Sequence, residues 1–239
     1  MNEPETKKVV LIGDSGVGKT SIISRFTTHK FDPGCQMSLN SQFTQKTLEF
    51  PEYNKSLQFD IWDTVGQEKY RSLTKIFYKS ADVIIFVYDI TSENSFNSIK
   101  NYWYTETINN TDKNPILVLA ANKSDLYKDE KINNSEGKNY ANEIKAIFGK
   151  ISALSNSGIN RLFENIGKKI IDPDYIINYQ DEKLLREIND LKSIKSHNTN
   201  KTKISNKTNI TNQTNQTKSL EIDNRIKLEG NTKGKKKCC

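Results

Sequence analysis

Hydrophobic and polar residues alternate along the first 171 residues in two different periods, which predicts strands and helices in turn. Short apolar runs predict six strands, at residues 7–12, 44–50, 57–62, 82–88, 116–121 and 148–152. Apolar residues at helical spacing predict helices at residues 19–27, 93–109, 135–148 and 159–171. Ser92 and Asn134 stand where the second and third helices would be capped. This alternation predicts an α/β fold with a mostly parallel sheet.

The pattern weakens after Pro173. Apolar residues recur at Leu184, Ile188, Leu191 and Ile194, which leaves both a short amphipathic helix and a plain linker open. Residues 197–218 consist almost entirely of Asn, Thr, Lys, Gln and Ser, so they lack the apolar surface that a fold requires. We therefore expect a folded domain over residues 5–172, a short helix or linker over 173–196, and a disordered basic tail over 197–239.

Positive charge is concentrated in that tail. Residues 1–171 carry 22 basic and 20 acidic side chains, whereas residues 192–239 carry 12 and 3. A basic tail suits an anionic lipid surface or a nucleic acid. No aromatic residue follows Tyr179, so the tail has no side chain for base stacking and we expect no nucleic acid partner.

The cysteines and the apolar runs indicate the cellular compartment in which the protein resides. Three sparse cysteines do not form a disulfide framework, which favours a reducing setting. The polar first residues contain no secretory signal. The longest strongly apolar run, residues 83–88, is far shorter than the roughly 20 residues of a membrane-spanning helix. We therefore expect an intracellular protein without a transmembrane segment.

Residues 13–20 read GDSGVGKT and match G-x-x-x-x-G-K-[ST] between a predicted strand and a predicted helix. In such a P-loop, glycines let the backbone curl so that successive N–H groups face phosphate oxygens. The amino end of the following helix adds positive potential. Lys19 supplies a full charge to the phosphates, and the Thr20 hydroxyl can bind Mg²⁺. The segment predicts a nucleotide site but does not separate GTP from ATP.

Three later segments favour guanine. Asp63 and Gly66 follow a predicted strand, where a carboxylate can hold Mg²⁺ through water and an N–H can reach a γ-phosphate. Residues 122–125 (NKSD) follow the next-to-last strand, and a carboxylate there can accept both guanine N1–H and N2–H₂. Residues 152–153 follow the last strand, where the Ala153 N–H can meet guanine O6. All lie at carboxyl ends of strands, where open α/β sheets bind ligands.

These strings resemble the Ras superfamily of small GTPases and, within it, the Rab family, over residues 7–171 and the terminal Cys pair. The matching strings are GDSGVGKT, WDTVGQEKYRSL, VYDITSENSF, NKSD, ISAL and KKKCC. The string WDTVGQEKY and residues 140–171 look most like endosomal Rabs. The resemblance implies a three-layer P-loop NTPase (small G-protein) domain with a mostly parallel six-stranded sheet. It also implies binding of GTP and GDP with Mg²⁺, slow GTP hydrolysis, and control of vesicle traffic by nucleotide-dependent effector recruitment.

The resemblance gives each matching residue a role. Nucleotide-binding positions are Ser15, Gly16, Val17, Gly18, Lys19, Thr20, Ser21, Phe31, Ser38, Asp63, Gly66, Asn122, Lys123, Asp125, Ser152, Ala153 and Leu154. The positions that match Mg²⁺ ligands are Thr20, Ser38 and Asp63, and Gln67 matches the glutamine that orients the attacking water. Positions that match effector contacts are Leu39, Asn40, Phe43, Trp62 and Phe77.

The resemblance also implies partners and a location. Cys238 and Cys239 match the doubly prenylated end of many Rabs, and two lipid chains hold a protein stably on a membrane. The implied location is the cytoplasmic face of an intracellular membrane, with a soluble cytosolic pool. The implied partners of this monomer are effectors, an exchange factor, a GTPase-activating protein and the prenylation and escort machinery.

Four positions depart from the family pattern, and the alternatives for each are neutral drift and altered switching. Ser38 and Asn40 stand in switch I for the usual Thr and Gly, and Val65 stands for Ala beside the γ-phosphate. Leu154 replaces the usual Lys of the base-binding turn. Two other functions stay open: a scaffold that barely hydrolyses GTP because of Val65, and an ATP-using P-loop enzyme such as a nucleotide kinase.

Overall fold

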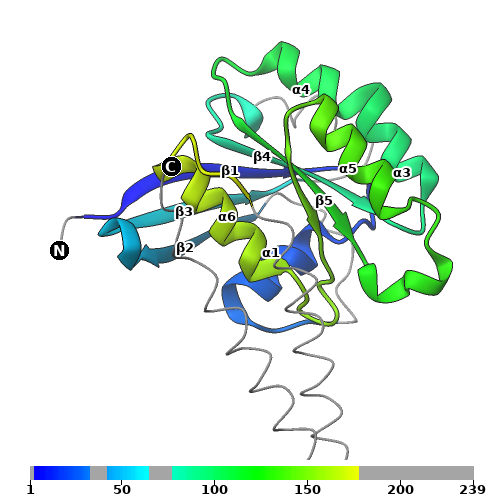
Figure 1. Ribbon diagram of the computed structural model, residues 1–239, viewed down its shortest axis with the longest axis horizontal. Helices are drawn as coiled ribbons and strands as arrows, with labels where there is room; N and C mark the ends of the chain where they lie inside the picture. Colours follow the sequence, from blue (N-terminus) through cyan, green and yellow to red (C-terminus); the bar gives the residue numbers. More distant parts are fainter. Residues whose placement is uncertain (1–2, 33–41, 65–76, 178–239) are drawn as a thin grey trace, which may run out of the picture. The chain divides into compact units, whose positions relative to one another are not determined.

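Six strands form one sheet within the described part of the chain, residues 3–32, 42–64 and 77–177, in the computed structural model (Figure 1). The strands are β1 (Glu5–Ile12), β2 (Gln42–Phe50), β3 (Lys55–Asp63), β4 (Val83–Asp89), β5 (Ile116–Asn122) and β6 (Ile147–Lys150). Their order is β2-β3-β1-β4-β5-β6. β2 pairs antiparallel with β3, and the other neighbouring pairs are parallel. The predicted α/β fold with a mostly parallel sheet is confirmed.

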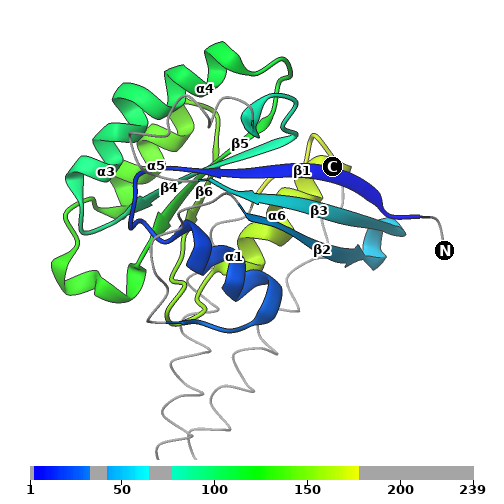
Figure 2. The ribbon, with the colours of Figure 1, turned by 180° about the vertical axis from the view of Figure 1, so that it is seen from behind.

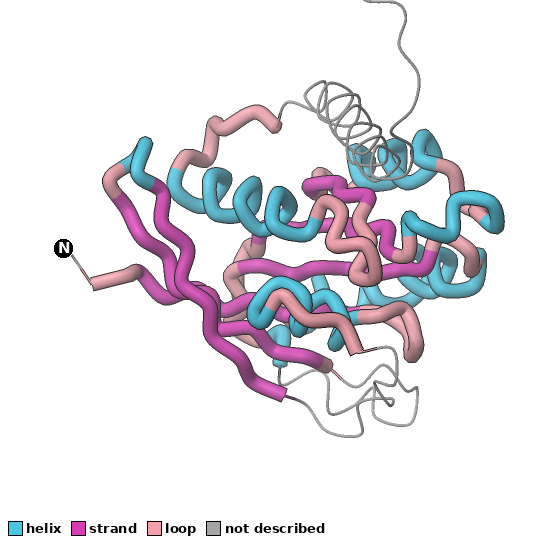
Figure 3. The backbone as a smooth tube through the Cα atoms, turned by 90° about the horizontal axis from the view of Figure 1, so that it is seen from below, coloured by secondary structure: helices cyan, strands magenta, loops and turns pink. Residues whose placement is uncertain are grey.

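Helices cover both faces of the sheet (Figures 1 and 2). One face carries α1 (Lys19–Thr28) and α6 (Ile159–Ile171), and the other carries α3 (Glu93–Ser98), α4 (Tyr104–Asn110) and α5 (Asn134–Glu143). Seen from below, the antiparallel β2 and β3 run side by side at one edge of the sheet (Figure 3). The central strand β4 is buried along its whole length, as a strand covered on both faces must be.

The layer of α1 and α6 is held by apolar contacts. Helix α6 buries Ile159, Leu162, Phe163 and Ile166 on one face. The rings of Phe163 and Phe26 stack with centroids 3.7 Å apart. Burial of one large apolar side chain contributes about 1.5–3 kcal/mol. This packing fixes α1, and with it the loop that precedes α1, against the sheet.

The helical stretch predicted at 93–109 contains a wider turn. It starts as predicted at Ser92, whose side chain accepts a hydrogen bond from the Ser95 N–H at 3.3 Å. Between α3 and α4, the segment Ile99–Trp103 is a π-helix. Such single wide turns are rare and frequently lie at functional sites. This one ends at the buried Trp103.

The predicted helix at 135–148 was wrong at its end and its cap. Helix α5 ends at Glu143 because Lys145 adopts a left-handed conformation, with φ of 54°. The following residues pair with β5 as β6, which ends at Lys150 and not at 152. The capping side chain is that of Asn133, not of Asn134, and accepts from the Glu136 N–H at 2.9 Å.

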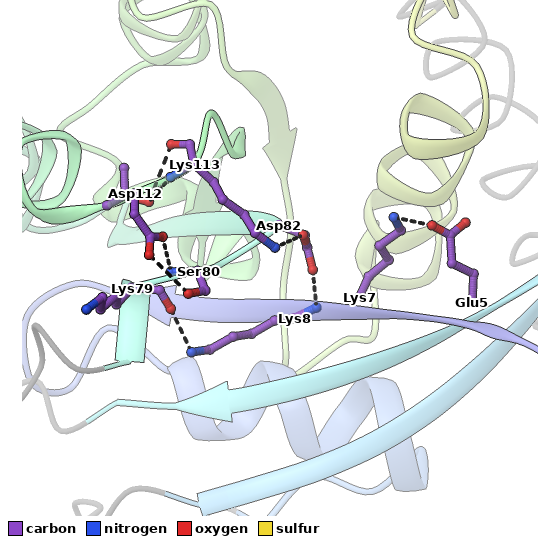
Figure 4. Close-up of polar contacts among 9 residues, drawn as sticks. Glu5, Lys7, Lys8, Lys79, Ser80, Asp82, Asp112 and Lys113 are labelled. Carbon is purple, nitrogen blue, oxygen red and sulfur yellow. Dashed lines mark hydrogen bonds and ion pairs between the residues drawn. The ribbon is translucent and has the colours of Figure 1, made fainter.

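A polar cluster joins the strands at their amino ends, opposite the strand ends that carry the predicted nucleotide motifs (Figure 4). The Asp82 carboxylate accepts from the Lys8 N–H and from Lys113 Nζ, both at 2.8 Å. Lys8 Nζ donates to the Lys79 carbonyl at 2.9 Å, and the Ser80 N–H donates to Asp112 at 2.7 Å. These bonds tie β1, the start of β4 and the segment before β5 together, so we assign the cluster a structural role.

Candidate functional site

The polar motifs predicted from the sequence meet at the carboxyl ends of β1, β3, β5 and β6. The loop of residues 13–18 joins β1 to α1, and Gly18 caps the helix in a left-handed conformation, with φ of 96°. A Cβ atom at Gly18 would lie 2.4 Å from Asn122 Nδ2. Only glycine meets both demands, because other residues rarely adopt this φ and have no room here. The loop therefore packs directly on the NKSD segment.

Lys19 is buried at the base of this loop. Its side chain is 6% exposed, and Nζ donates to the Gly13 and Asp14 carbonyls, both at 2.8 Å. Burial lowers the pKa of Lys19 to about 8, although the negative charges of Asp63 and Asp14 partly offset this effect. The site thus holds a desolvated cation beside a curled backbone, which is the environment that an anionic ligand requires.

Thr20 and Asp63 form an oxygen-rich pair next to Lys19. The Thr20 hydroxyl donates to Asp63 Oδ2 at 2.5 Å, and Asp63 is 2% exposed. The adjacent Thr64 hydroxyl donates to the Leu11 carbonyl at 2.6 Å, which fixes the end of β3 against β1. Hydroxyl and carboxylate oxygens are the ligands that Mg²⁺ prefers, so these donors fit that ion.

Asn122 connects the phosphate loop to the turn after β6. Its Nδ2 donates to the Val17 carbonyl at 2.8 Å, and its Oδ1 accepts from the Ala153 N–H at 3.3 Å. The side chain is 1% exposed. Three segments far apart in the sequence are therefore joined through one amide, whose planar shape supplies one donor and one acceptor in opposite directions.

Asp125 lies over the same turn. Its Oδ1 accepts a hydrogen bond from the Ser152 hydroxyl at 2.5 Å, and the Ser155 N–H donates to Ser152 Oγ at 3.0 Å. These bonds fix one carboxylate oxygen and hold the carboxyl plane. The arrangement presents a carboxylate in a defined orientation beside the Ala153 N–H.

Lys123 pairs with a carboxylate that the sequence did not indicate. Lys123 has a left-handed backbone, with φ of 63°, and its Nζ lies 2.7 Å from Asp89 Oδ2. Burial by itself would raise the pKa of Asp89. Hydrogen bonds from Lys123 and Thr91 outweigh that effect and hold the pKa below its ordinary value. The ion pair fixes the Lys123 side chain at the edge of the site.

Two further residues reach the site from a distance. Trp103 Nε1 donates to Asp14 Oδ1 in the phosphate loop at 2.8 Å. Arg25 of α1 donates to the Ala153 and Leu154 carbonyls, both at 2.9 Å. Both contacts are long-range, and no local spacing indicates them. The π-helical turn places Trp103, and such a turn has no signal in the sequence.

Three aromatic residues predicted as effector contacts lie in a row. Phe43 and Trp62 are partners across β2 and β3, with ring centroids 5.0 Å apart. The centroids of Trp62 and Phe77 are 5.6 Å apart. Phe43 is 48% exposed, so this end of the row lies at the surface. Phe31, in contrast, packs partly buried against the core.

The structure brings together the predicted residues of the phosphate loop, Asp63, the NKSD segment and the turn of residues 152–154. Ser15 and Gly16 form the exposed crest of the loop, and Ser21 follows in α1. Other predicted positions lie outside the described residues and stay predictions. They are Ser38, Leu39, Asn40, Val65, Gly66, Gln67, Cys238 and Cys239.

Comparisons with known proteins agree with this arrangement. Residues 8–172 match the family model described as the Ras family. The chain is 39% identical to the human (Homo sapiens) Ras-related protein Rab-22A over 167 residues, which are 70% of this chain and 84% of that protein. It is 35% identical to Ras-related protein RabC of Dictyostelium discoideum over 164 residues, 69% and 83% of the two chains. Ras-related protein Rab-11A of the same organism is 36% identical over 159 residues, 66% and 73%.

Proposed function

The chain belongs to the Ras family and is a Rab-type small GTPase, and from this premise we propose that it is a GTP-binding, slowly GTP-hydrolysing switch of membrane traffic. One observation carries the proposal: a curled loop with a buried lysine, a Thr–Asp oxygen pair and a fixed carboxylate meet at the carboxyl ends of the strands. Each of these groups matches one part of a guanine nucleotide. The proposed reaction converts GTP and water to GDP and phosphate.

The phosphate half of the nucleotide fits the loop of residues 13–20. Lys19 exchanges its contacts with the Gly13 and Asp14 carbonyls for contacts with phosphate oxygens, so its charge is retained without loss of hydrogen bonds. Thr20 and Asp63, with Ser38, would hold a Mg²⁺ ion, which neutralises negative charge on the phosphates when bound. Gln67 would orient the attacking water, and the Gly66 N–H would donate a hydrogen bond to the γ-phosphate. Catalysis then rests on positioning and charge stabilisation.

We expect nucleotide affinity to depend on the charge of Lys19. The pKa of Lys19 is about 8 in the unliganded protein, and contact with phosphates raises it. Below the pKa of the unliganded protein, Lys19 is protonated with or without ligand, so GDP affinity does not depend on pH through this residue. Above that pKa, binding requires proton uptake, so GDP affinity falls by up to about tenfold per pH unit. Calorimetry at pH 8.8 in two buffers of different ionisation heat measures this uptake.

The control for that experiment is Lys19→Met, which removes the titrating group. Proton uptake that persists in this variant belongs to the nucleotide or to another residue. Equal proton uptake by the variant and the natural protein at pH 8.8 contradicts the assignment to Lys19.

The base half fits the NKSD segment and the turn of residues 152–154. Asp125 accepts the guanine N1–H and N2–H₂ groups, and the Ala153 N–H donates to O6. Adenine carries a donor where guanine carries O6, so it opposes this pattern. A competition between GTP and ATP for fluorescent GDP tests the proposal. GTP should displace the probe at concentrations at least about 100-fold lower than ATP, since rejecting a ligand that leaves buried polar groups unpaired is a strong effect. Equal displacement supports the nucleotide kinase alternative instead.

Nucleotide-dependent partner binding is the proposed output. The γ-phosphate would order the segments around Ser38 and Gly66, and hydrolysis would release them. Leu39 and Asn40, with the aromatic row of Phe43, Trp62 and Phe77, form the proposed effector surface. The proposed partners are effectors, an exchange factor, a GTPase-activating protein and the prenylation and escort machinery.

We propose that the tail anchors the protein to the cytoplasmic face of an intracellular membrane. Among the described residues, no helix is long and apolar enough to cross a bilayer. Cys238 and Cys239 directly follow a run of lysines, so two lipids and a basic patch would act together. Residues 197–239 would serve as a tether between the GTPase domain and the membrane.

Replacing both terminal cysteines by serine should move the full-length protein from the membrane fraction to the soluble fraction. Replacing one cysteine should give an intermediate distribution, because a single lipid chain holds only weakly. Fractionation of expressing cells, followed by immunoblotting, measures the distribution. The lipid anchor is wrong if the double variant still sediments with membranes.

A further inference from the structure

Arg25 in the last turn of α1 contacts the base half of the site without lying at a position of any nucleotide-binding motif. Its three side-chain nitrogens each donate to a main-chain carbonyl. Nε donates to Ala153 at 2.9 Å, Nη2 to Leu154 at 2.9 Å, and Nη1 to His29 at 2.8 Å. The planar guanidinium fork thus links the end of its own helix to two successive peptides of the turn after β6.

The bonds to the Ala153 and Leu154 carbonyls determine where the next N–H group in each case points. A peptide unit is planar and trans, so fixing the Ala153 carbonyl also fixes the Leu154 N–H on the opposite side of that unit. The next N–H, that of Ser155, donates to Ser152 Oγ at 3.0 Å. The Leu154 N–H has no hydrogen bond within the part of the chain that the structure describes. It follows directly after the Ala153 N–H, which donates to Asn122 Oδ1 at 3.3 Å.

Arg25 also contacts Phe31, the residue that the family resemblance matches to the aromatic ring on the guanine. Its guanidinium carbon lies 5.7 Å from the centroid of the Phe31 ring, within the range of a cation–π interaction. Phe31 packs against the hydrophobic core on its other side. One side chain therefore holds both the turn that donates hydrogen bonds and the aromatic ring proposed to pack on the base.

We propose that Arg25 is a positioning residue for guanine recognition: it holds the Leu154 N–H where it meets the 6-oxo group, next to the Ala153 N–H, and it holds Phe31 beside them. The inference rests on the proposed function and deepens it, because it names the group that sets base discrimination and nucleotide release. It also accounts for Leu154, which replaces a lysine of the family pattern. The Leu154 side chain is 53% exposed and takes no part in these contacts, which the main chain of Leu154 makes.

The test measures release of fluorescent GDP from the full chain and from Arg25→Gln and Arg25→Lys. Loss of two charged hydrogen-bond donors should speed release from Arg25→Gln by about 10- to 100-fold. Arg25→Lys keeps the charge but replaces the fork with one nitrogen, so its rate should lie between the two. Lys145→Gln removes a positive charge from a residue near the amino ends of β5 and β6 and should release GDP at the natural rate.

A second ligand separates recognition from general destabilisation. The 2-aminopurine riboside diphosphate lacks the 6-oxo group, and it binds less tightly to every variant because its N1 also lacks a proton. In competition assays, Arg25→Gln should weaken GDP by at least about tenfold but this analogue by less than about threefold. Equal weakening of both ligands, or natural release rates in Arg25→Gln, overturns the inference. If the natural protein binds no GDP at all, the proposed function fails instead.

Discussion

Replacing Asp125 by asparagine should lower GDP affinity by about 100- to 10,000-fold, because two hydrogen bonds to a charged group contribute roughly 1.5–3 kcal/mol each. Asparagine has the same shape and can still accept from the Ser152 hydroxyl, which bonds Asp125 Oδ1 at 2.5 Å. Its amide nitrogen, however, donates where guanine also donates. Xanthine carries a carbonyl oxygen at C2 in place of the guanine amino group, so the variant should bind xanthosine diphosphate more tightly than the natural protein does.

Competition of GDP and xanthosine diphosphate against a fluorescent nucleotide measures both changes in one assay. Asp129→Asn is the matched control, since Asp129 is an exposed aspartate at the end of the same short 3₁₀-helical segment, Ser124–Asp129. It should behave like the natural protein. An Asp125→Asn variant that keeps its GDP affinity and gains none for the xanthine nucleotide would remove Asp125 from the base site.

Replacing Lys19 by methionine should reduce GDP affinity by roughly 30- to 5,000-fold, the range for removing one partner of a buried charged contact, about 2–5 kcal/mol. Lys19 is 6% exposed and lies among the loop carbonyls, so no solvent layer weakens its attraction for phosphate. The substitution also removes a buried cation that costs free energy to desolvate. The unliganded variant should therefore unfold at a temperature no lower than the natural protein.

Lys8→Met is the control for this variant. Lys8 lies on β1, the strand that precedes the phosphate loop, and burial likewise lowers its pKa, but it belongs to the polar cluster at the amino ends of the strands (Figure 4). Its loss should leave the shift in melting temperature on adding GDP unchanged. The phosphate site is misplaced if Lys8→Met abolishes that shift and Lys19→Met preserves it.

The fold was largely predictable because its strands follow simple rules. β4 and β5 are short continuous apolar runs, as the central strands of a sheet covered on both faces are. The end of α5 was not predictable, since Ile144, Ile147 and Phe148 continue the helical spacing of apolar residues into β6. Pairing with β5 determines the outcome there, and that is a tertiary effect. The π-helical turn before Trp103 likewise has no glycine or proline to announce it.

The site was predictable where it consists of local strings and unpredictable where it consists of contacts. The position of the site at the carboxyl ends of the strands was predictable, because the phosphate loop, Asp63 and the NKSD segment each follow a predicted strand. The partners Arg25 and Trp103 lie 128 and 89 residues from the groups that they hold, so only the folded chain reveals them. In the sequence, Asp89 is only the end of a predicted strand. Its role becomes apparent in the structure, where it forms an ion pair with Lys123.

We expect this chain to hydrolyse GTP slowly and to switch state by doing so. The direct measurement is a single turnover: purified protein loaded with GTP and Mg²⁺, with phosphate release followed over time. A small GTPase without its activator hydrolyses at about 10⁻⁴ s⁻¹, and we expect release on that scale. Such a result makes Val65 a tolerated substitution. Retention of intact GTP without phosphate release would contradict the claim and identify the protein as a locked, GTP-bound scaffold.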